Sequence, residues 1–255
     1  MADSVWIPTS YAAETGDAVR ARRSAVVRVT HWITAAAFLA LLVTGVEILI
    51  SHPRFYWGET GNSGTTPLFQ FHIPSSRGTV PTGYGYVLPD QNGWSRYLHF
   101  EAAWVAVLTG LLYGIWGFVS GHFRRNLLPA SGDLRFDHLM KTMRGHLRLR
   151  VAGEDGAGSY NVLQRISYLV VIFVLFPLVI WTGLAMSPGF TAAFPSLVTI
   201  LGGQQSARTL HFLVSVVLVA FVLIHILMVA VSGFRERMRG MITGRMGAGE
   251  KGGGR

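Results

Sequence analysis

Residues 209–231 constrain this 255-residue chain more than any other segment. They are almost entirely apolar, carry no formal charge, and are long enough to cross a lipid bilayer as a helix. They nevertheless contain two histidines, His211 and His225. An imidazole is costly in hydrocarbon, so each histidine requires a partner inside the protein. A 14-residue spacing returns to within about 40° of the same helix face and separates the two by about 21 Å. One helix face therefore presents an imidazole near each membrane surface.

Three further apolar segments are long enough to span a membrane, namely residues 29–50, 98–119 and 166–186. Half of the residues are apolar and only 14% are charged, which is the composition of a membrane protein. The sequence therefore predicts an all-α protein, an integral membrane four-helix bundle forming a single domain. Pro177 lies inside the third span, where we expect it to kink the helix.

The segments between the spans alternate between many and few basic residues. Residues 1–30, 120–165 and 233–255 together hold 18 of the 22 Lys and Arg, and the connections 51–97 and 187–208 hold four. By the positive-inside rule, we expect both termini and the middle loop to face the cytoplasm. The net charge of +9 therefore reflects topology, and nucleic-acid binding is not expected.

The connecting segments differ in character. The outer loop, residues 51–93, is long and rich in Gly, Pro and aromatic residues, which is typical of a functional or docking loop. Residues 133–151 have the periodicity of an amphipathic helix lying on the inner membrane surface, and the tail 244–255 is Gly-rich. The remaining histidines, among them His52 and His122, are expected to be solvated or at headgroup level, with a partner or proton role as the alternative.

A short pattern opens three of the four spans, in which Arg stands three residues before His and an aromatic residue follows the His. The three Arg–His pairs are Arg28 and His31, Arg96 and His99, and Arg208 and His211. Residues i and i+3 share a helix face. A guanidinium at the membrane surface can therefore pair a haem propionate while the imidazole one turn deeper binds the iron.

The topology sorts these histidines by depth. The first span enters from the inside, so His31 lies near the inner surface, at the level of His225. The second and fourth enter from the outside, so His99 and His211 lie near the outer surface. The two matched pairs predict two haems, each with two axial histidines. The alternatives are structural or proton-relay histidines, or a zinc site, which usually needs three or four close ligands. The chain has no Cys, which excludes covalent c-type haem and thiolate-held clusters.

This pattern resembles the cytochrome b subunits of nickel–iron hydrogenases and formate dehydrogenases, with bacterial cytochrome b561 in the same broad family. The resemblance covers residues 28 to about 235, and the final pair with its 14-residue gap is its most specific element. It implies two haem b groups, with His99 and His211 holding the outer one and His31 and His225 the inner one.

Other stretches resemble this family as well. Tyr160, Asn161, Gln164 and Arg165 match a segment that precedes its third span. In the formate dehydrogenase relatives an Asn of this region contacts a quinone near the inner haem, which implies that role for Asn161, with Gln164 beside it. Asn161 is equally well placed by sequence to cap the third helix. Residues 52–59 and 202–208 look like a subgroup paired with periplasmic molybdopterin oxidoreductases of the sulfite-oxidase type.

Together these features predict a dihaem b-type cytochrome, a membrane-anchoring subunit that passes electrons between a periplasmic oxidoreductase and the quinone pool. The partner is expected to be molybdopterin-dependent or of the hydrogenase or formate dehydrogenase type. One alternative is a stand-alone quinone-linked oxidoreductase, such as a superoxide oxidase. Another is a haem-free transporter, although the spans lack the paired Gly/Pro breaks and carboxylate chains of a transport path.

Overall fold

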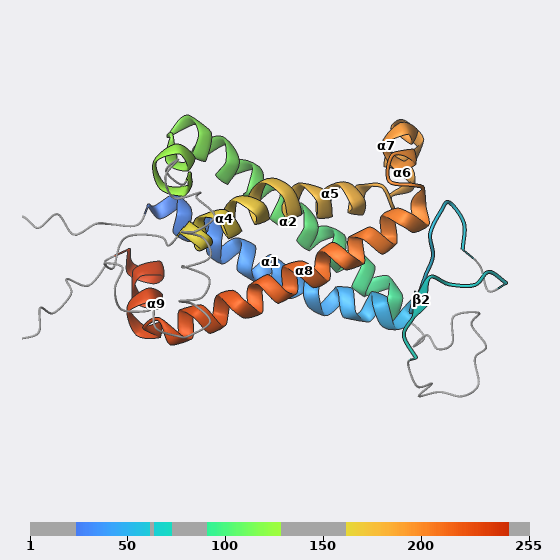
Figure 1. The fold of residues 1–255 in the computed structure, drawn as a ribbon, viewed down its shortest axis with the longest axis horizontal. Coiled ribbons are helices and arrows are strands. Elements are labelled where there is room, and N and C mark those ends of the chain that lie inside the picture. Colours follow the sequence, from blue (N-terminus) through green and yellow to red (C-terminus); the bar gives the residue numbers. More distant parts are fainter. Residues whose placement is uncertain (1–23, 62–63, 73–90, 129–161, 245–255) are drawn as a thin grey trace, which may run out of the picture.

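The computed structural model describes residues 24–61, 64–72, 91–128 and 162–244. Four long apolar helical segments run along the long axis of the molecule and form its body (Figure 1). They are α1 (Ala25–Ser51), α2 (Gln91–Val119), the third span made of α4 (Val162–Val170), a π-helical turn (Val171–Leu175) and α5 (Phe176–Leu184), and α8 (Gln204–Val231). The all-α class and the four predicted spans are thus confirmed.

The outer surfaces of these helices suit a lipid environment. Large apolar side chains are widely exposed along them, for example Leu39, Leu111 and Leu223. Many of the side chains buried within the spans are small, for example Ala37 and Ala106, although Leu218 is buried as well. Lipid is as apolar as leucine, so helices in a membrane gain more from close backbone approach through small residues than from burying large ones.

The third span is interrupted where the sequence predicts a kink. Pro177 stands at the start of α5, directly after the π-helical turn Val171–Leu175. Proline has no N–H to donate, and its ring collides with the carbonyl of the residue four positions earlier. A widened turn relieves that collision, so the interruption has a local cause in the sequence.

The helices pack as two pairs, α1 with α2 and α5 with α8. One end of the bundle holds the start of α1, the π-helical turn Phe123–Leu127 after α2, and α9 (Phe234–Thr243) after α8 (Figure 1). We call it the basic end, because its described segments include Arg124, Arg125, Arg235, Arg237 and Arg239. The opposite end, the loop end, holds the short strands and two short helices, α6 (Pro188–Ala193) and α7 (Pro195–Thr199).

A small hairpin forms in the described part of the connection between α1 and α2. Strand β1 (Arg54–Phe55) pairs antiparallel with β2 (Phe69–Gln70). The rings of Phe55, Phe69 and Phe71 gather around Phe212 of α8, with ring centres 4.6 to 6.0 Å from it. Aromatic contact of this kind fixes the hairpin against the helix that carries His211.

The loop also caps the N-terminus of α8. The backbone N–H of Gln205 and of Ser206 both donate to the carbonyl of Gly58, at 3.0 and 3.2 Å. The N–H of Gln204 donates to the Glu59 carboxylate at 3.2 Å. The first N–H groups of a helix have no acceptor within the helix. These bonds supply acceptors for three of them and at the same time tie the loop to α8.

At the basic end, α9 folds back onto the start of α1. The Arg28 guanidinium donates to the carbonyl of Ile242 at 2.7 Å, and the Trp32 indole donates to that of Met241 at 3.2 Å. The last carbonyls of α9 thereby gain partners, one of them cationic. This surface helix was not predicted. The helix predicted at 133–151 and the tail 245–255 lie outside the described residues.

Replacing Gly203 with Ala should weaken the loop–α8 junction. Gly203 has a φ of +101°, and an added Cβ would lie 2.8 Å from the backbone of Gly58 and Glu59. Strain of this kind costs about 1–3 kcal/mol. We expect a lower thermal unfolding midpoint in detergent than for the control Gly189→Ala, whose added Cβ meets nothing within 4 Å. Equal midpoints for the two variants would contradict the close packing.

Candidate functional site

The bundle interior brings four histidines together as two pairs. His99 of α2 faces His211 of α8, with ring centres 6.3 Å apart and ring planes inclined at 65°. His31 of α1 faces His225 of α8, also at 6.3 Å and at 62°. The first pair lies toward the loop end and the second toward the basic end. α8 therefore contributes one member to each pair, and its partner comes from a different helix each time.

The separation within each pair fits two imidazoles bound to one metal ion. A metal–imidazole bond is about 2.0–2.1 Å, and a ring nitrogen lies about 1.1 Å from its ring centre, so two axial rings should be about 6 Å apart. Direct stacking of two rings would bring them closer. Both pairs, at 6.3 Å, have the spacing of a bis-imidazole site.

The ring nitrogens of His99 are differentiated by its surroundings. Its Nδ1 lies 2.9 Å from the hydroxyl oxygen of Thr44 in α1. That hydroxyl is 2.7 Å from the carbonyl of Ala40, to which it donates its single proton. The threonine oxygen therefore accepts from Nδ1–H, which leaves Nε2 with the free lone pair that a metal requires.

His211 is held in the same tautomer. Its Nδ1 lies 3.0 Å from the carbonyl of Val179 and 3.2 Å from the hydroxyl of Thr182. A carbonyl can only accept, so Nδ1 carries the proton and Nε2 carries the lone pair. Metal-binding histidines in proteins almost always donate their second nitrogen to an oxygen in this way.

Two glycines give the loop-end rings room. A Cβ added at Gly183 would lie 3.3 Å from Cε1 of His211, and one at Gly45 would lie 3.7 Å from Cε1 of His99. The first distance is tighter than ordinary contact. A side chain at position 183 would therefore press on the imidazole of His211. Glycine at this position lets the ring pack directly against the backbone of α5.

Aromatic rings surround the basic-end pair. The His225 ring stacks on Phe221 with centres 6.1 Å apart and lies 6.4 Å from Tyr168. Trp32 lies edge-on to His31 at 5.4 Å. These rings give the basic-end pair an apolar, aromatic environment, which suits a large flat conjugated group.

A zinc-type site is not supported. Within the part of the chain that the structure describes, no three His, Cys, Asp or Glu side chains gather closely enough to share a metal ion. Each histidine pair supplies two ligands only. The donor set fits haem iron, whose porphyrin provides the other four ligands.

The two arginines predicted at the loop end converge on one histidine. A guanidinium nitrogen of Arg96 lies 3.2 Å from Nε2 of His52. Arg208 donates to the backbone carbonyls of His52 and Arg54 at 2.6 and 2.8 Å, and its guanidinium carbon lies 5.0 Å from the ring centre of Phe55. These contacts concentrate positive charge at the loop end. Arg28, the third arginine, lies at the basic end against α9.

His52 belongs to this cluster, although the sequence suggested a solvated or headgroup-level residue. Its pKa is lowered from 6.5 to about 4, by burial and by the nearby Arg96 and Arg208. A neutral imidazole can accept the hydrogen bond from Arg96. The sequence carries no signal for this role except the position of His52 directly after a span.

Three further candidates from the sequence are Gln164, Asn161 and His122. Gln164 lies in α4, and Asn161 lies outside the described residues. His122 packs against Trp116 at the basic end, with ring centres 4.8 Å apart, and burial and Arg125 lower its pKa.

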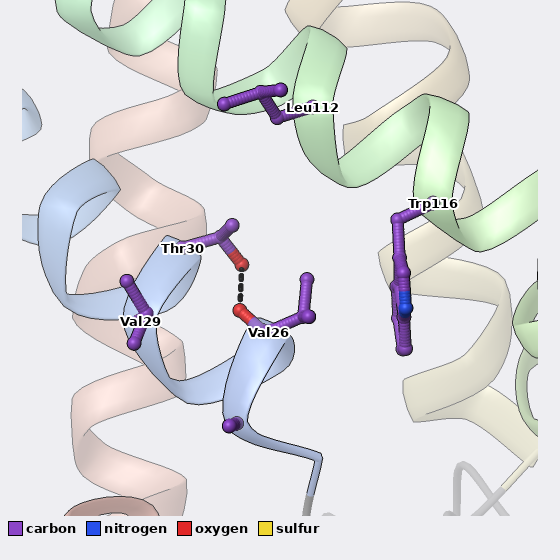
Figure 2. Close-up of a pocket in the computed structure, with 6 residues that line it drawn as sticks. Val26, Val29, Thr30, Leu112 and Trp116 are labelled. Carbon is purple, nitrogen blue, oxygen red and sulfur yellow. Dashed lines mark hydrogen bonds between the residues drawn. The ribbon is translucent and has the colours of Figure 1, made fainter.

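A groove of about 450 Å³ opens between α1 and α2 at the basic end (Figure 2). It is lined by Ala25, Val26, Val29, Thr30, Leu112 and Trp116. The Thr30 hydroxyl donates to the carbonyl of Val26 at 2.7 Å. The walls are apolar, so the groove suits a hydrocarbon chain better than a polar head group.

Comparison with known proteins identifies the family of this chain. The family model for prokaryotic cytochrome b561 matches residues 22–244. The chain belongs to this family. It is therefore a b-type haem electron-transfer protein that crosses the bacterial inner membrane several times.

Its relatives include proteins named as subunits of larger enzymes. A protein of Azospira oryzae, whose name describes it as the protein-methionine-sulfoxide reductase subunit YedZ1, is 30% identical over 208 residues, which cover 80% of this chain and 87% of the relative. Proteins named as Ni/Fe-hydrogenase B-type cytochrome subunits are more distant. The one from Cupriavidus necator is 24% identical over 79% of this chain and 75% of its own. The one from Azotobacter chroococcum is 25% identical over 81% and 78%.

The pKa of His52 predicts a pH-dependent stability. Between pH 6.5 and about 4 the unfolded chain binds a proton at His52 that the folded protein does not. Stability should therefore fall as the pH is lowered through this window. The variant His52→Gln keeps an acceptor for Arg96 but does not titrate, so its thermal midpoint should fall less between pH 7 and pH 4.5.

The exposed His72 of the same loop provides the control. His72→Gln should keep the pH dependence of the unmodified protein. If His52→Gln and His72→Gln show the same dependence, His52 is not the group responsible.

Proposed function

We propose that this cytochrome holds two b haems and passes electrons through the membrane between a partner enzyme at the loop end and quinone at the basic end. The observation that carries the proposal is the pair of equal histidine separations, 6.3 Å each, at two levels of α8. His99 and His211 hold the loop-end haem. His31 and His225 hold the basic-end haem.

The ligand set defines the chemistry of these haems. An iron with two axial imidazoles has no open coordination position, so each haem exchanges electrons and binds no substrate. Both ligand pairs draw on α8, and their α8 members are about 21 Å apart along the helix axis. This arrangement suits electron transfer from one membrane surface to the other.

The orientation follows from the distribution of positive charge. The described parts of segments 1–30, 120–165 and 233–255 lie at the basic end, and these segments carry 18 of the 22 Lys and Arg of the sequence, which supports a cytoplasmic position for that end. The loop end, with the β1–β2 hairpin, α6 and α7, faces the periplasm. Arg96 and Arg208 at the loop end and Arg28 at the basic end place positive charge near each haem, where propionates need it.

The partner is a catalytic oxidoreductase subunit on the periplasmic side. Relatives of this chain are named as subunits of a protein-methionine-sulfoxide reductase and of Ni/Fe-hydrogenases. The first of these is the more similar and supports a partner of the reductase class, for which a molybdopterin enzyme fits the resemblance of residues 52–59 and 202–208. The loop end offers that partner a structured surface, because hydrogen bonds hold the loop to α8.

Quinone exchanges electrons with the basic-end haem. Its oxygens need polar partners in an apolar surrounding, and its reduction needs protons from a nearby wet surface. Asn161 and Gln164, at the start of the third span, are the side chains proposed to contact it. The basic segment between the second and third spans, residues 120–165, is proposed to give access to protons.

The haem content of the purified protein tests the main proposal. We expect about two protohaems per polypeptide. His99→Ala or His211→Ala should remove one of them, and His31→Ala or His225→Ala the other, because an iron that loses an axial imidazole is held less tightly. Pyridine haemochrome spectra and redox titration measure both effects. His72→Ala, a change outside the bundle, should retain two haems, and a content of one that is unaffected by His99→Ala would overturn the loop-end site.

Two substitutions at position 161 test the quinone contact. Asn161→Ala removes both the amide and any helix cap, whereas Asn161→Ser removes the amide but keeps a good cap. If Asn161 binds quinone, both variants should lower the quinone-linked rate per haem while leaving the haem spectra unchanged. If it only caps the helix, Asn161→Ala should lose about 1 kcal/mol of stability and neither variant should change the rate per haem.

A further inference from the structure

We propose that Thr44 and Thr182 are positioning residues that orient the two loop-end histidines and lower the reduction potential of the haem between them. The inference rests on the proposed dihaem function. It concerns contacts made by two helices, α1 and α5, that supply no ligand to that haem.

The two threonines have the same local geometry. The Thr44 hydroxyl is 2.7 Å from the carbonyl of Ala40, and the Thr182 hydroxyl is 2.8 Å from that of Leu178, each four residues earlier in its own helix. Each hydroxyl oxygen also lies beside the Nδ1 of a histidine on another helix, at 2.9 Å for His99 and 3.2 Å for His211. A β-branched side chain has few rotamers in a helix, so the hydroxyl is held where the ring needs it.

The direction of these bonds follows from the single hydroxyl proton of threonine. Each hydroxyl donates that proton to a carbonyl of its own helix, so its oxygen can only accept a hydrogen bond from Nδ1–H of the histidine. Both threonines are fully buried, with 0% of their surface exposed. Water does not compete for these bonds, and a hydrogen bond in a low-dielectric interior is electrostatically stronger than one in water.

The electronic consequence follows from this direction. An imidazole that donates its Nδ1 proton to an oxygen gains negative character and becomes a stronger donor to iron through Nε2. A stronger donor stabilises ferric over ferrous iron and so lowers the reduction potential. The same bond stops the ring from rotating, which maintains the 65° angle between the two ring planes.

The two contacts should differ in strength. Among the described residues, Thr44 is the one hydrogen-bond partner at Nδ1 of His99. His211 has a second acceptor, the carbonyl of Val179 at 3.0 Å, which would remain if the Thr182 hydroxyl were removed. Loss of the hydroxyl should therefore matter more at position 44 than at position 182.

A third threonine provides a matched control. The Thr30 hydroxyl bonds the carbonyls of Val26 and Val27 at 2.7 and 3.3 Å, and the Thr44 hydroxyl bonds those of Ala40 and Leu41 at the same two distances. Within the described part of the chain, the Thr30 hydroxyl bonds no histidine ring. Thr30→Val removes the same bond within α1 as Thr44→Val does, without touching a loop-end ligand.

The experiment compares Thr44→Val, Thr182→Val, Thr30→Val and the conservative Thr44→Ser in the full-length protein. Redox titration resolves the two haem potentials, electron paramagnetic resonance of the oxidised protein reports the axial ring geometry, and haem retention is measured on the same samples. We expect the loop-end potential to rise in both Val variants, more in Thr44→Val. Haem affinity at that site should fall on the order of tenfold in Thr44→Val. Thr44→Ser and Thr30→Val should leave the loop-end haem unchanged.

The outcomes separate this inference from the proposed function. If Thr44→Val and Thr182→Val leave the potentials and resonance spectra unchanged while His99→Ala removes one haem, the threonine role is wrong and the dihaem proposal stands. A shift of the loop-end haem in Thr30→Val equal to that in Thr44→Val would also overturn the inference. Loss of the loop-end haem in Thr44→Val but not in Thr44→Ser would support it. If His99→Ala keeps both haems, both proposals fail.

Discussion

The cost of an imidazole in hydrocarbon governs this molecule. A neutral histidine has one donor and one acceptor nitrogen, and neither finds water in the middle of a bilayer. At the loop end the protein satisfies the donor with oxygens of Thr44, Val179 and Thr182. The acceptor nitrogen is left for the iron of the proposed haem. The packing of the helices must therefore bring each histidine both to its oxygen and to its partner ring.

Helix α8 takes part in both histidine pairs, one near each end of the bundle. Its two histidines face partners from α2 and from α1, so one helix carries a ligand to each proposed haem. At the loop end, α1 and α5 place oxygens of Thr44, Val179 and Thr182 beside the histidines of α2 and α8. The loop end is secured by a separate set of contacts, because the segment around Gly58 caps the first turn of α8 and Arg208 holds the backbone at His52. A periplasmic partner would thus meet a surface fixed to the helix that carries His211.

Arginines at both ends of the bundle make specific contacts within the protein. Arg96 and Arg208 lie around a neutral His52, whose low pKa keeps a third positive charge out of the cluster at physiological pH. In the proposed dihaem arrangement, these two fixed positive charges would match the two propionates of one haem. At the basic end, Arg28 binds the last turn of α9, so the same arginine that lies near His31 also holds a surface helix in place.

The sequence by itself determined the spans, their number and the pairing of the histidines at two levels along the bundle, because a bilayer imposes its thickness on every helix that crosses it. It also indicated the break near Pro177, which has a local cause. Other features lay beyond it. Thr44 and His99 are 55 residues apart, and Thr182 and His211 are 29 apart. Whether a threonine on one helix meets an imidazole on another depends on how the helices are rotated and crossed, which no local periodicity encodes. The role of His52 and the docking of α9 were likewise decided by tertiary packing.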